Sequence, residues 1–240
     1  MWEELADAEN LDAKLWPRLA AIAERFWSPQ STTDVDSMYR RLYLTNHWLE
    51  WLGLTQRSNL ELMRQRLAAD LRYQPLDRFI TILTPVKGYS RHAGRNLSST
   101  PLNRLVDSIP PESDAAREFS NAVDRYLAAP KEQRDSAPLK KQLDIWIESA
   151  AAAKPIFEAN SILAENIALS ESVTTLCKTA EEALSYLDPN ATTPAADWKQ
   201  RSATILETAS KRQGDFLIAI APAVQNLVNA IQPDTQQAPK

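Results

Sequence analysis

The amino-acid sequence predicts a mainly α-helical protein, and three observations support this fold class. Apolar residues recur at three- and four-residue steps through most of the 240 residues, which is the spacing of one buried face of a helix. After Pro101 no alternation of apolar and polar residues competes with that period. Proline and glycine fall where the periodic segments end, as helix boundaries require.

Two helices are predicted before residue 53. The first begins at Pro17, whose missing N–H does no harm in a first turn, and it runs to Trp27. Thr33 or Asp34 is placed to cap the second helix. Gly53 is placed to end it, because glycine tolerates the backbone conformation that closes many helices.

A third helix and a long loop follow. The helix is predicted over residues 59–72, and Pro75 ends it. Its apolar stripe consists of Leu60, Met63, Leu67 and Leu71. Residues 76–83 are too short and too apolar for their period to decide between helix and strand. Residues 85–101 are predicted to form an ordered loop, and long loops inside compact domains are often functional.

Nearly all of the chain beyond residue 101 is predicted to be helical. The predicted helices span residues 102–108, 114–127, 139–153, 156–186 and 195–231. The last two are long and amphipathic, and the short connection between them, 188–194, predicts that they pack antiparallel. Residues 233–240 are polar, contain two prolines and are expected to be disordered.

Composition excludes several classes of function. The net charge of −4 and the pI near 5.4 give no basic field for nucleic acid. No apolar run approaches the roughly 20 residues that a membrane span needs. The four glycines make no phosphate-binding loop, and the single cysteine, Cys177, excludes an internal disulfide. His47 and His92 are the only histidines, so neither a metal site nor a cofactor is predicted.

The chain changes composition near residues 53–58. Five of the seven tryptophans precede this point, whereas alanine dominates later stretches. We therefore expect three parts: a segment over residues 1–55, a helical domain over 56–232 and a tail over 233–240.

Four motifs at the start of the chain are linked in register. They are Trp2 to Glu4, Asn10-Leu11, Leu15 to Arg18 and Ala21 to Ser28. Together they resemble, without a gap, the closing segment of the catalytic barrel in family 20 glycoside hydrolases, the β-N-acetylhexosaminidases. The resemblance covers only about the first fifty residues. It implies the last strand and helices of a (β/α)8 barrel, followed by an all-helical carboxy-terminal domain.

The resemblance gives substrate-binding roles to Trp2 and Glu4. Trp2 matches the tryptophan that walls the pocket for N-acetylglucosamine or N-acetylgalactosamine, and an indole face suits the C–H face of a sugar ring. Glu4 matches a carboxylate that accepts hydrogen bonds from sugar hydroxyls. Asp7 and Asn10 are expected to support the turn that follows. Members of the family are often exported, but no export segment can be read here, so localisation stays unassigned.

The resemblance also implies which catalytic groups this sequence lacks. In this family the acetamido oxygen of the substrate is the nucleophile. An Asp-Glu pair within His-x-Gly-Gly-Asp-Glu assists it, and this motif does not occur in the sequence. A complete barrel takes about 250 residues. We therefore expect a truncated reading frame or a fragment, with no catalytic residue in the chain and no activity of the chain alone.

Further residues and alternatives stay open. In the 85–101 loop Tyr89, Arg91 and His92 are candidates for sugar contacts, with plain loop solvation as the alternative. Arg18, Glu24 and Arg25 are expected to form structural ion pairs. His47 and Cys177 are expected to be packed. Trp2, Trp16, Trp27 and Trp51 are expected to be more exposed than is usual for tryptophan. The rival function is a stand-alone helical module for interaction or carbohydrate positioning, and a homo-oligomer remains open.

Overall fold

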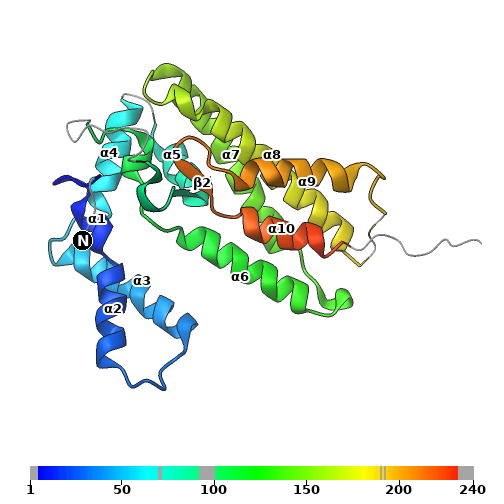
Figure 1. Ribbon diagram of the computed structural model, residues 1–240, viewed down its shortest axis with the longest axis horizontal. Helices are drawn as coiled ribbons and strands as arrows, with labels where there is room; N and C mark the ends of the chain where they lie inside the picture. Colours follow the sequence, from blue (N-terminus) through cyan, green and yellow to red (C-terminus); the bar gives the residue numbers. More distant parts are fainter. Residues whose placement is uncertain (1–4, 70–71, 92–100, 190, 192, 232–240) are drawn as a thin grey trace, which may run out of the picture. The chain divides into compact units, whose positions relative to one another are not determined.

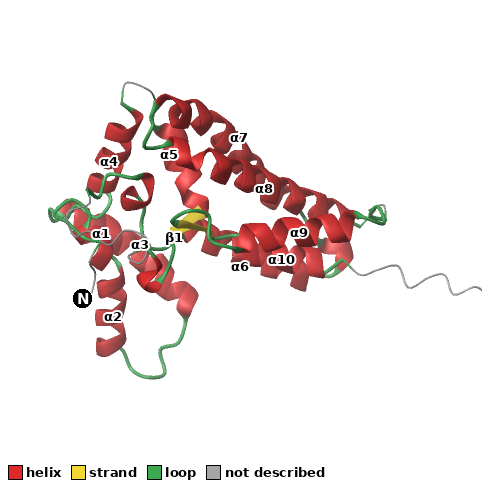
Figure 2. Ribbon diagram, turned by 45° about the horizontal axis from the view of Figure 1, so that its top comes forward, coloured by secondary structure: helices red, strands yellow, loops and turns green. Residues whose placement is uncertain are grey.

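A computed structural model describes residues 5–69, 72–91, 101–189, 191 and 193–231. The described residues are mostly helical, which confirms the predicted class (Figure 2). They divide into two compact units, each described by itself. The first unit comprises Met1–Ala69 with Lys87–Pro111, and the second comprises Asp70–Val86 with Glu112–Lys240. These units are sets of residues that contact one another. The domain boundary near residue 55, which composition leads us to expect, stays a prediction.

The first unit contains four α-helices and two short 3-10 turns among its described residues (Figure 1). They are α1 (Leu11–Leu15), α2 (Arg18–Trp27), α3 (Val35–Trp51), α4 (Ser58–Ala68), η2 (Gly88–Ser90) and η4 (Leu105–Ser108). Asp34 caps α3 as predicted, since its side chain accepts a hydrogen bond from the Ser37 backbone N–H at 2.8 Å. Gly53 follows α3 with φ +98°, a conformation that favours glycine.

The core of the first unit lies where α1 meets α4. Ala13, Leu60 and Met63 form one buried cluster, and Leu67 continues the predicted stripe along α4. Neither α2 nor α3 contains a buried residue. The prediction of a helix over 102–108 is wrong in part, because only the 3-10 turn η4 forms there.

The second unit contains the longer helices and two short strands (Figure 1). Its elements are α5 (Gln74–Phe79), η1 (Ile80–Ile82), β1 (Leu83–Pro85), α6 (Asp114–Ala128), η5 (Lys131–Gln133), α7 (Ala137–Ala159), η6 (Ala164–Asn166), α8 (Ile167–Leu187), α9 (Trp198–Ser210), β2 (Phe216–Ile218) and α10 (Ala221–Asn229). Large buried side chains fill its core, including Phe79, Trp146 and Phe157. The Trp146 indole N–H donates to the Thr81 hydroxyl at 2.9 Å, so this buried polar group is satisfied.

The prediction of one helix over 156–186 is wrong. Ile156 belongs to the end of α7, and α8 begins only at Ile167. Asn160 turns the chain between them, because its side-chain oxygen accepts a hydrogen bond from the Ile162 backbone N–H at 2.9 Å. An asparagine side chain competes in this way with the helix for backbone groups.

The prediction of one helix over 195–231 is also wrong. The helix α9 ends at Ser210, and Gly214 adopts φ +60° in a turn. The strand β2 follows and pairs antiparallel with β1, with Leu83 opposite Ile218 (Figure 2). The undecided segment 76–83 is therefore helical at first and enters a strand at its end. Three-residue strands are too short to leave a clear alternating pattern in the sequence.

The helices α8 and α9 run antiparallel, as the short connection predicts. Near the end of α8, Glu182 accepts a hydrogen bond from the indole N–H of Trp198 at 2.6 Å, at the start of α9. Near the start of α8, Ser172 lies 3.5 Å from the side-chain oxygen of Gln213, just after α9. Within the described residues no helix is long and apolar enough to cross a membrane.

Asp188 links three helices at the end of α8. Its carboxylate accepts hydrogen bonds from Lys140 of α7 at 2.9 Å and from the Tyr126 hydroxyl of α6 at 3.4 Å. Burial acts to raise the pKa of Asp188, but the hydrogen bonds from Lys140, Ser136 and Tyr126 outweigh it and leave the pKa lowered. Burial, with the charge of Asp188, raises the pKa of Tyr126 to about 12. The ionised carboxylate therefore stabilises this end of the unit.

Asp188→Asn should lower the free energy of unfolding at pH 7 by about 1 kcal/mol, a modest value because solvent screens these partly exposed groups. The folded-state pKa is lowered, so the stabilisation is present above the ordinary value of 3.8 and is lost as the pH falls through the folded pKa. Urea unfolding at pH 7 and pH 3 measures both effects. Asp197→Asn, at an exposed pair with Arg201, is the matched control. If both variants lost the same free energy of unfolding at pH 7, the Asp188 carboxylate would not have the stabilising role given to it here.

Candidate functional site

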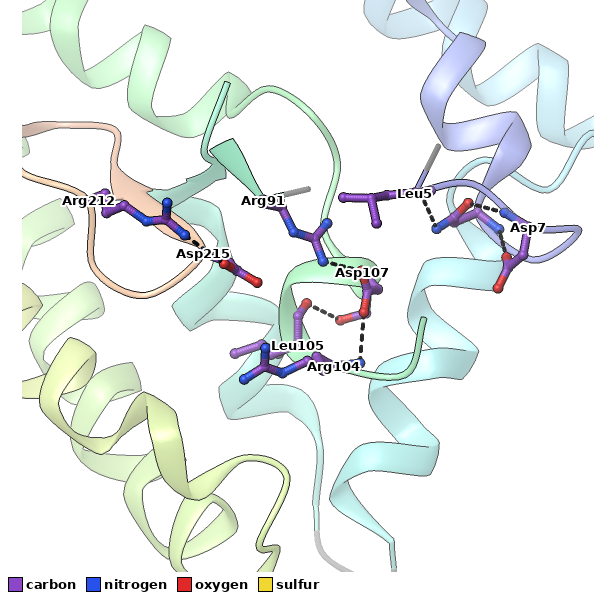
Figure 3. Close-up of polar contacts among 10 residues, drawn as sticks. Leu5, Asp7, Arg91, Arg104, Leu105, Asp107, Arg212 and Asp215 are labelled. Carbon is purple, nitrogen blue, oxygen red and sulfur yellow. Dashed lines mark hydrogen bonds and ion pairs between the residues drawn. The ribbon is translucent and has the colours of Figure 1, made fainter. Parts of the chain in front are cut away.

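Trp2 and Glu4 are followed in the sequence by a turn over residues 5–10, whose polar contacts are drawn in Figure 3. Trp2 and Glu4 themselves lie outside the described residues, so the structure does not place them. In the turn, the Asp7 carboxylate accepts hydrogen bonds from the backbone N–H groups of Glu9 at 2.9 Å and Asn10 at 3.1 Å. The Asn10 side-chain oxygen accepts one in return from the Asp7 N–H at 3.0 Å.

Asn10 is fully buried and fixes the path of the chain. Besides the bond from Asp7, its side-chain amide donates to the Leu5 carbonyl at 3.4 Å. One side chain thus binds the backbone three and five residues upstream. This agrees with the expectation that Asp7 and Asn10 support the turn.

The turn is tied to α4 by hydrogen bonds that sequence reasoning missed. Asp12 accepts from both the backbone N–H of Thr55 at 2.9 Å and its hydroxyl at 3.0 Å. The Asn59 side chain donates to the Glu9 carbonyl at 3.0 Å, and Glu9 forms an ion pair with Arg66. The partners lie more than forty residues apart in sequence, and no local pattern connects them.

The charged residues of α2 are structural, although their pairing differs from the simplest expectation. Glu24 pairs with Arg41 of α3, and this hydrogen bond raises the pKa of Arg41. Arg18 instead donates to the Lys14 carbonyl, and Arg25 donates to the Thr32 carbonyl at 2.7 Å. Thus one ion pair joins α2 to α3, while the two arginines of α2 bind the backbone.

The loop candidates fall in different environments. Tyr89 is exposed in η2, while Arg91 is buried and its guanidinium lies 2.6 Å from the buried Asp107 carboxylate (Figure 3). Asp107 also accepts a hydrogen bond from the Arg104 backbone N–H at 3.0 Å, which caps η4. Arg91 therefore anchors the loop to η4. His92 lies outside the described residues, and sugar contacts from Tyr89, Arg91 and His92 stay predictions.

Two further residues are packed, as expected from their sequence context. The His47 ring lies 4.6 Å from the Tyr43 ring, and its Nδ1 is 2.8 Å from the Tyr43 carbonyl oxygen. Cys177 is buried in α8, and burial raises the pKa of its thiol. In the part of the chain that the structure describes, no group of three or more His, Cys, Asp or Glu side chains could hold a metal ion.

The tryptophans of α2 and α3 are exposed, as the sequence predicts. Trp27 is 90% exposed and Trp51 is 86% exposed. Trp16 is half-buried, and Trp2 lies outside the described residues. Side chains of this size are usually well buried in a folded domain.

Comparison with known proteins shows what the first part of the chain is similar to. Residues 1–30 match glycosyl hydrolase family 20, catalytic domain. The β-hexosaminidase subunit beta of Mus musculus is 50% identical over 42 residues, which cover 18% of this chain and 8% of the mouse protein. A chitooligosaccharidolytic β-N-acetylglucosaminidase of Ostrinia furnacalis is 46% identical over 44 residues, or 18% of this chain and 7% of that protein.

A solved structure resembles the chain over much more of its length. The X-ray structure of Flavobacterium johnsoniae chitobiase matches with a TM-score of 0.83 and 27% sequence identity, covering 95% of this chain and 34% of that one. The matched proteins are a β-hexosaminidase, a β-N-acetylglucosaminidase and a chitobiase, and residues 1–30 are similar to the catalytic domain of glycosyl hydrolase family 20. The chain spans about a third of the chitobiase chain.

Asn10→Ala should lower the free energy of unfolding by about 1–3 kcal/mol, because the buried Asn10 side chain no longer makes its hydrogen bonds to the Asp7 N–H and the Leu5 carbonyl. Chemical denaturation of the full chain measures the change. Asn103→Ala, at an exposed position, is the control and should stay within about 0.5 kcal/mol of the parent. A loss no larger than that of the control would show that the turn does not depend on Asn10.

Proposed function

We propose that this chain is the carboxy-terminal part of a β-N-acetylhexosaminidase that removes terminal N-acetylhexosamine residues from glycans. The observation that carries the proposal is the double match: residues 1–30 match a family 20 catalytic domain, and 95% of the chain matches the chitobiase structure. In this proposal residues 1–55 complete a (β/α)8 barrel, and residues 56–232 form a helical domain that accompanies it.

Trp2 and Glu4 form one side of the proposed sugar pocket. The indole of Trp2 covers the apolar face of the N-acetylhexosamine ring, while Glu4 accepts hydrogen bonds from the hydroxyl groups and so fixes its orientation. The turn held by Asp7 and Asn10 supports this role, because it fixes the chain immediately after these residues. A site built on such a fixed support holds its geometry well.

The proposed reaction needs two acids that this sequence does not supply. The acetamido oxygen of the substrate attacks the anomeric carbon while the bond to the leaving oxygen breaks. A glutamic acid protonates the leaving oxygen, and a neighbouring aspartate orients the acetamide. The 240 residues contain no His-x-Gly-Gly-Asp-Glu motif. The proposal therefore assigns both acids to other residues of the intact enzyme and predicts that the chain alone is inactive.

A stand-alone helical module is the alternative function. The second unit favours it, because its core contains fully buried large side chains such as Trp146, Phe157 and Trp198. Such a unit has the apolar core that independent folding requires. In this alternative the first fifty residues contribute no sugar contact to any active site.

A chimera distinguishes the two functions. In the chimera, this chain replaces the 34% of the chitobiase chain that it covers. We expect it to release nitrophenol from a nitrophenyl N-acetylglucosaminide, whereas the isolated chain should not. Activity of the isolated chain above a no-enzyme blank would contradict the assignment of the acids, and a folded but inactive chimera would favour the helical module.

Glu4→Gln in the chimera tests the sugar contact. Loss of a charged hydrogen bond of about 1.5–3 kcal/mol should lower kcat/KM about 10- to 150-fold. Glu207→Gln makes the same chemical change at an exposed position of α9 and should leave kcat/KM unchanged. Equal kinetics of the two variants would remove Glu4 from the site.

A further inference from the structure

The helices α7 and α8 pack side by side and are joined by two ion pairs (Figure 1). Lys140, near the start of α7, pairs with Asp188, just after the end of α8, at 2.9 Å. Lys154, near the end of α7, pairs with Glu171, near the start of α8, at 3.6 Å. The two helices are therefore antiparallel, and the ion pairs show which levels of the two helices lie opposite each other.

This register brings two acidic residues to the same level between the ion pairs. Asp144 lies ten residues before Lys154 on α7, and Glu181 lies ten residues after Glu171 on α8. In antiparallel helices that both rise by about 1.5 Å per residue, equal steps from a facing pair reach equal levels. The register thus places a carboxyl group of α7 opposite a carboxyl group of α8.

Helical spacing also puts both acidic residues on the sides of the helices that meet. Asp144 follows Lys140 by four residues, and Glu181 precedes Asp188 by seven, so each shares a side with the ion pair at that end. The side chains of Glu181 and Asp144 are within hydrogen-bond reach of each other. The α7–α8 seam consists of Lys140, Asp144, Lys154, Glu171, Glu181 and Asp188.

The surroundings of Glu181 favour its protonated form. The side chain is half-buried, and burial raises its pKa. The hydrogen bond with Asp144 and the charge of Asp144 raise this pKa further. Lys178 of α8 and Lys140 of α7 act in the opposite direction, but the pKa of Glu181 stays above its ordinary value of 4.5.

The other elements packed against α8 are α9, α10 and η6. The sequence of α10 contains no charged residue, and Glu165 of η6 lies at the opposite end of α8 from Glu181. On α8 itself, the neighbouring Glu182 accepts the indole N–H of Trp198. The charged residues of α9 have partners of their own: Lys199, Arg201 and Glu207 bind the Ile231 carbonyl, Asp197 and Lys211. Asp144 and the two lysines are thus the charged groups that act on Glu181 in the described part of the chain.

We propose that Asp144 and Glu181 share one proton across the α7–α8 seam, which makes the seam a pH-sensitive contact that is tightest in weakly acidic solution. A hydrogen bond between two carboxyl groups requires this proton, because an ionised carboxylate has no donor. When the proton passes to water, two negative charges face each other and repel. The inference concerns the helical unit and does not depend on the proposed function.

The pairs at the seam respond to pH in opposite directions. Because the folded-state pKa of Glu181 is raised, its stabilising contribution is fully present below 4.5 and is lost as the pH rises through the folded pKa. The pKa of Asp188 is lowered, so its contribution is present above 3.8 and is lost as the pH falls through the folded pKa. Both contributions are complete only between these two ordinary values, in weakly acidic solution.

Thermal unfolding of the full chain at pH 4 and pH 7 tests the proposal. Glu181→Gln removes the repulsion at pH 7 and should raise Tm there by about 1–3 °C, a small shift because both groups are partly solvated. At pH 4 this gain should vanish, since the glutamic acid of the parent is then protonated. Glu158→Gln makes the same chemical change at an exposed position of α7 and should keep the Tm of the parent at both pH values. No gain at pH 7, or an equal gain at both pH values, would overturn the proposal.

A second variant measures the coupling between the two carboxyl groups. Asp144→Asn alone should also raise Tm at pH 7, and the double variant with Glu181→Gln should gain no more than either single variant, because one change already ends the repulsion. The midpoint of Glu181 in a 13C NMR titration should lie above 4.5 in the parent and fall in Asp144→Asn. Additive gains in Tm, or a midpoint that Asp144→Asn leaves unchanged, would show that no proton is shared.

Discussion

The first unit depends on the contact of Asp12 with Thr55. This carboxylate accepts hydrogen bonds from the N–H and the hydroxyl of a residue 43 positions away, and so connects α1 to the segment just before α4. The contact matters because α2 and α3, which lie between these points in sequence, bury no residue. Local packing around Ala13 and Leu60 and these polar bonds therefore hold a segment that lacks an extensive core.

The second unit follows the opposite principle. Its helices bury large apolar side chains, and the indole N–H of the buried Trp146 finds a partner in the Thr81 hydroxyl. The two strands are only three residues long. Their antiparallel pairing nevertheless joins residues 83–85 to residues 216–218, which are far apart in the sequence. Hydrophobic burial stabilises this unit by itself, whereas the first unit presents apolar area that its own residues leave exposed.

Much of the helical structure could be predicted from local patterns. Asp34 caps α3 and the stripe of α4 is buried, because both features depend on residues three or four positions apart. The breaks at Asn160 and Gly214 were missed, since apolar periodicity continues across both. For the site, the supporting turn at Asp7 and Asn10 was anticipated. The bonds of Asp12 and Asn59 were not, because their partners are distant in sequence.

The sequence by itself determined the resemblance to glycosyl hydrolase family 20, through four motifs in register, and the helical class, through its period. It also showed that the known acid motif is absent from these residues. Only the tertiary structure decided that Arg91 is buried against Asp107 and that the apolar sides of α2 and α3 face outward. The physical reason is that a period identifies an apolar side of a helix, whereas burial depends on which distant residues come to cover it.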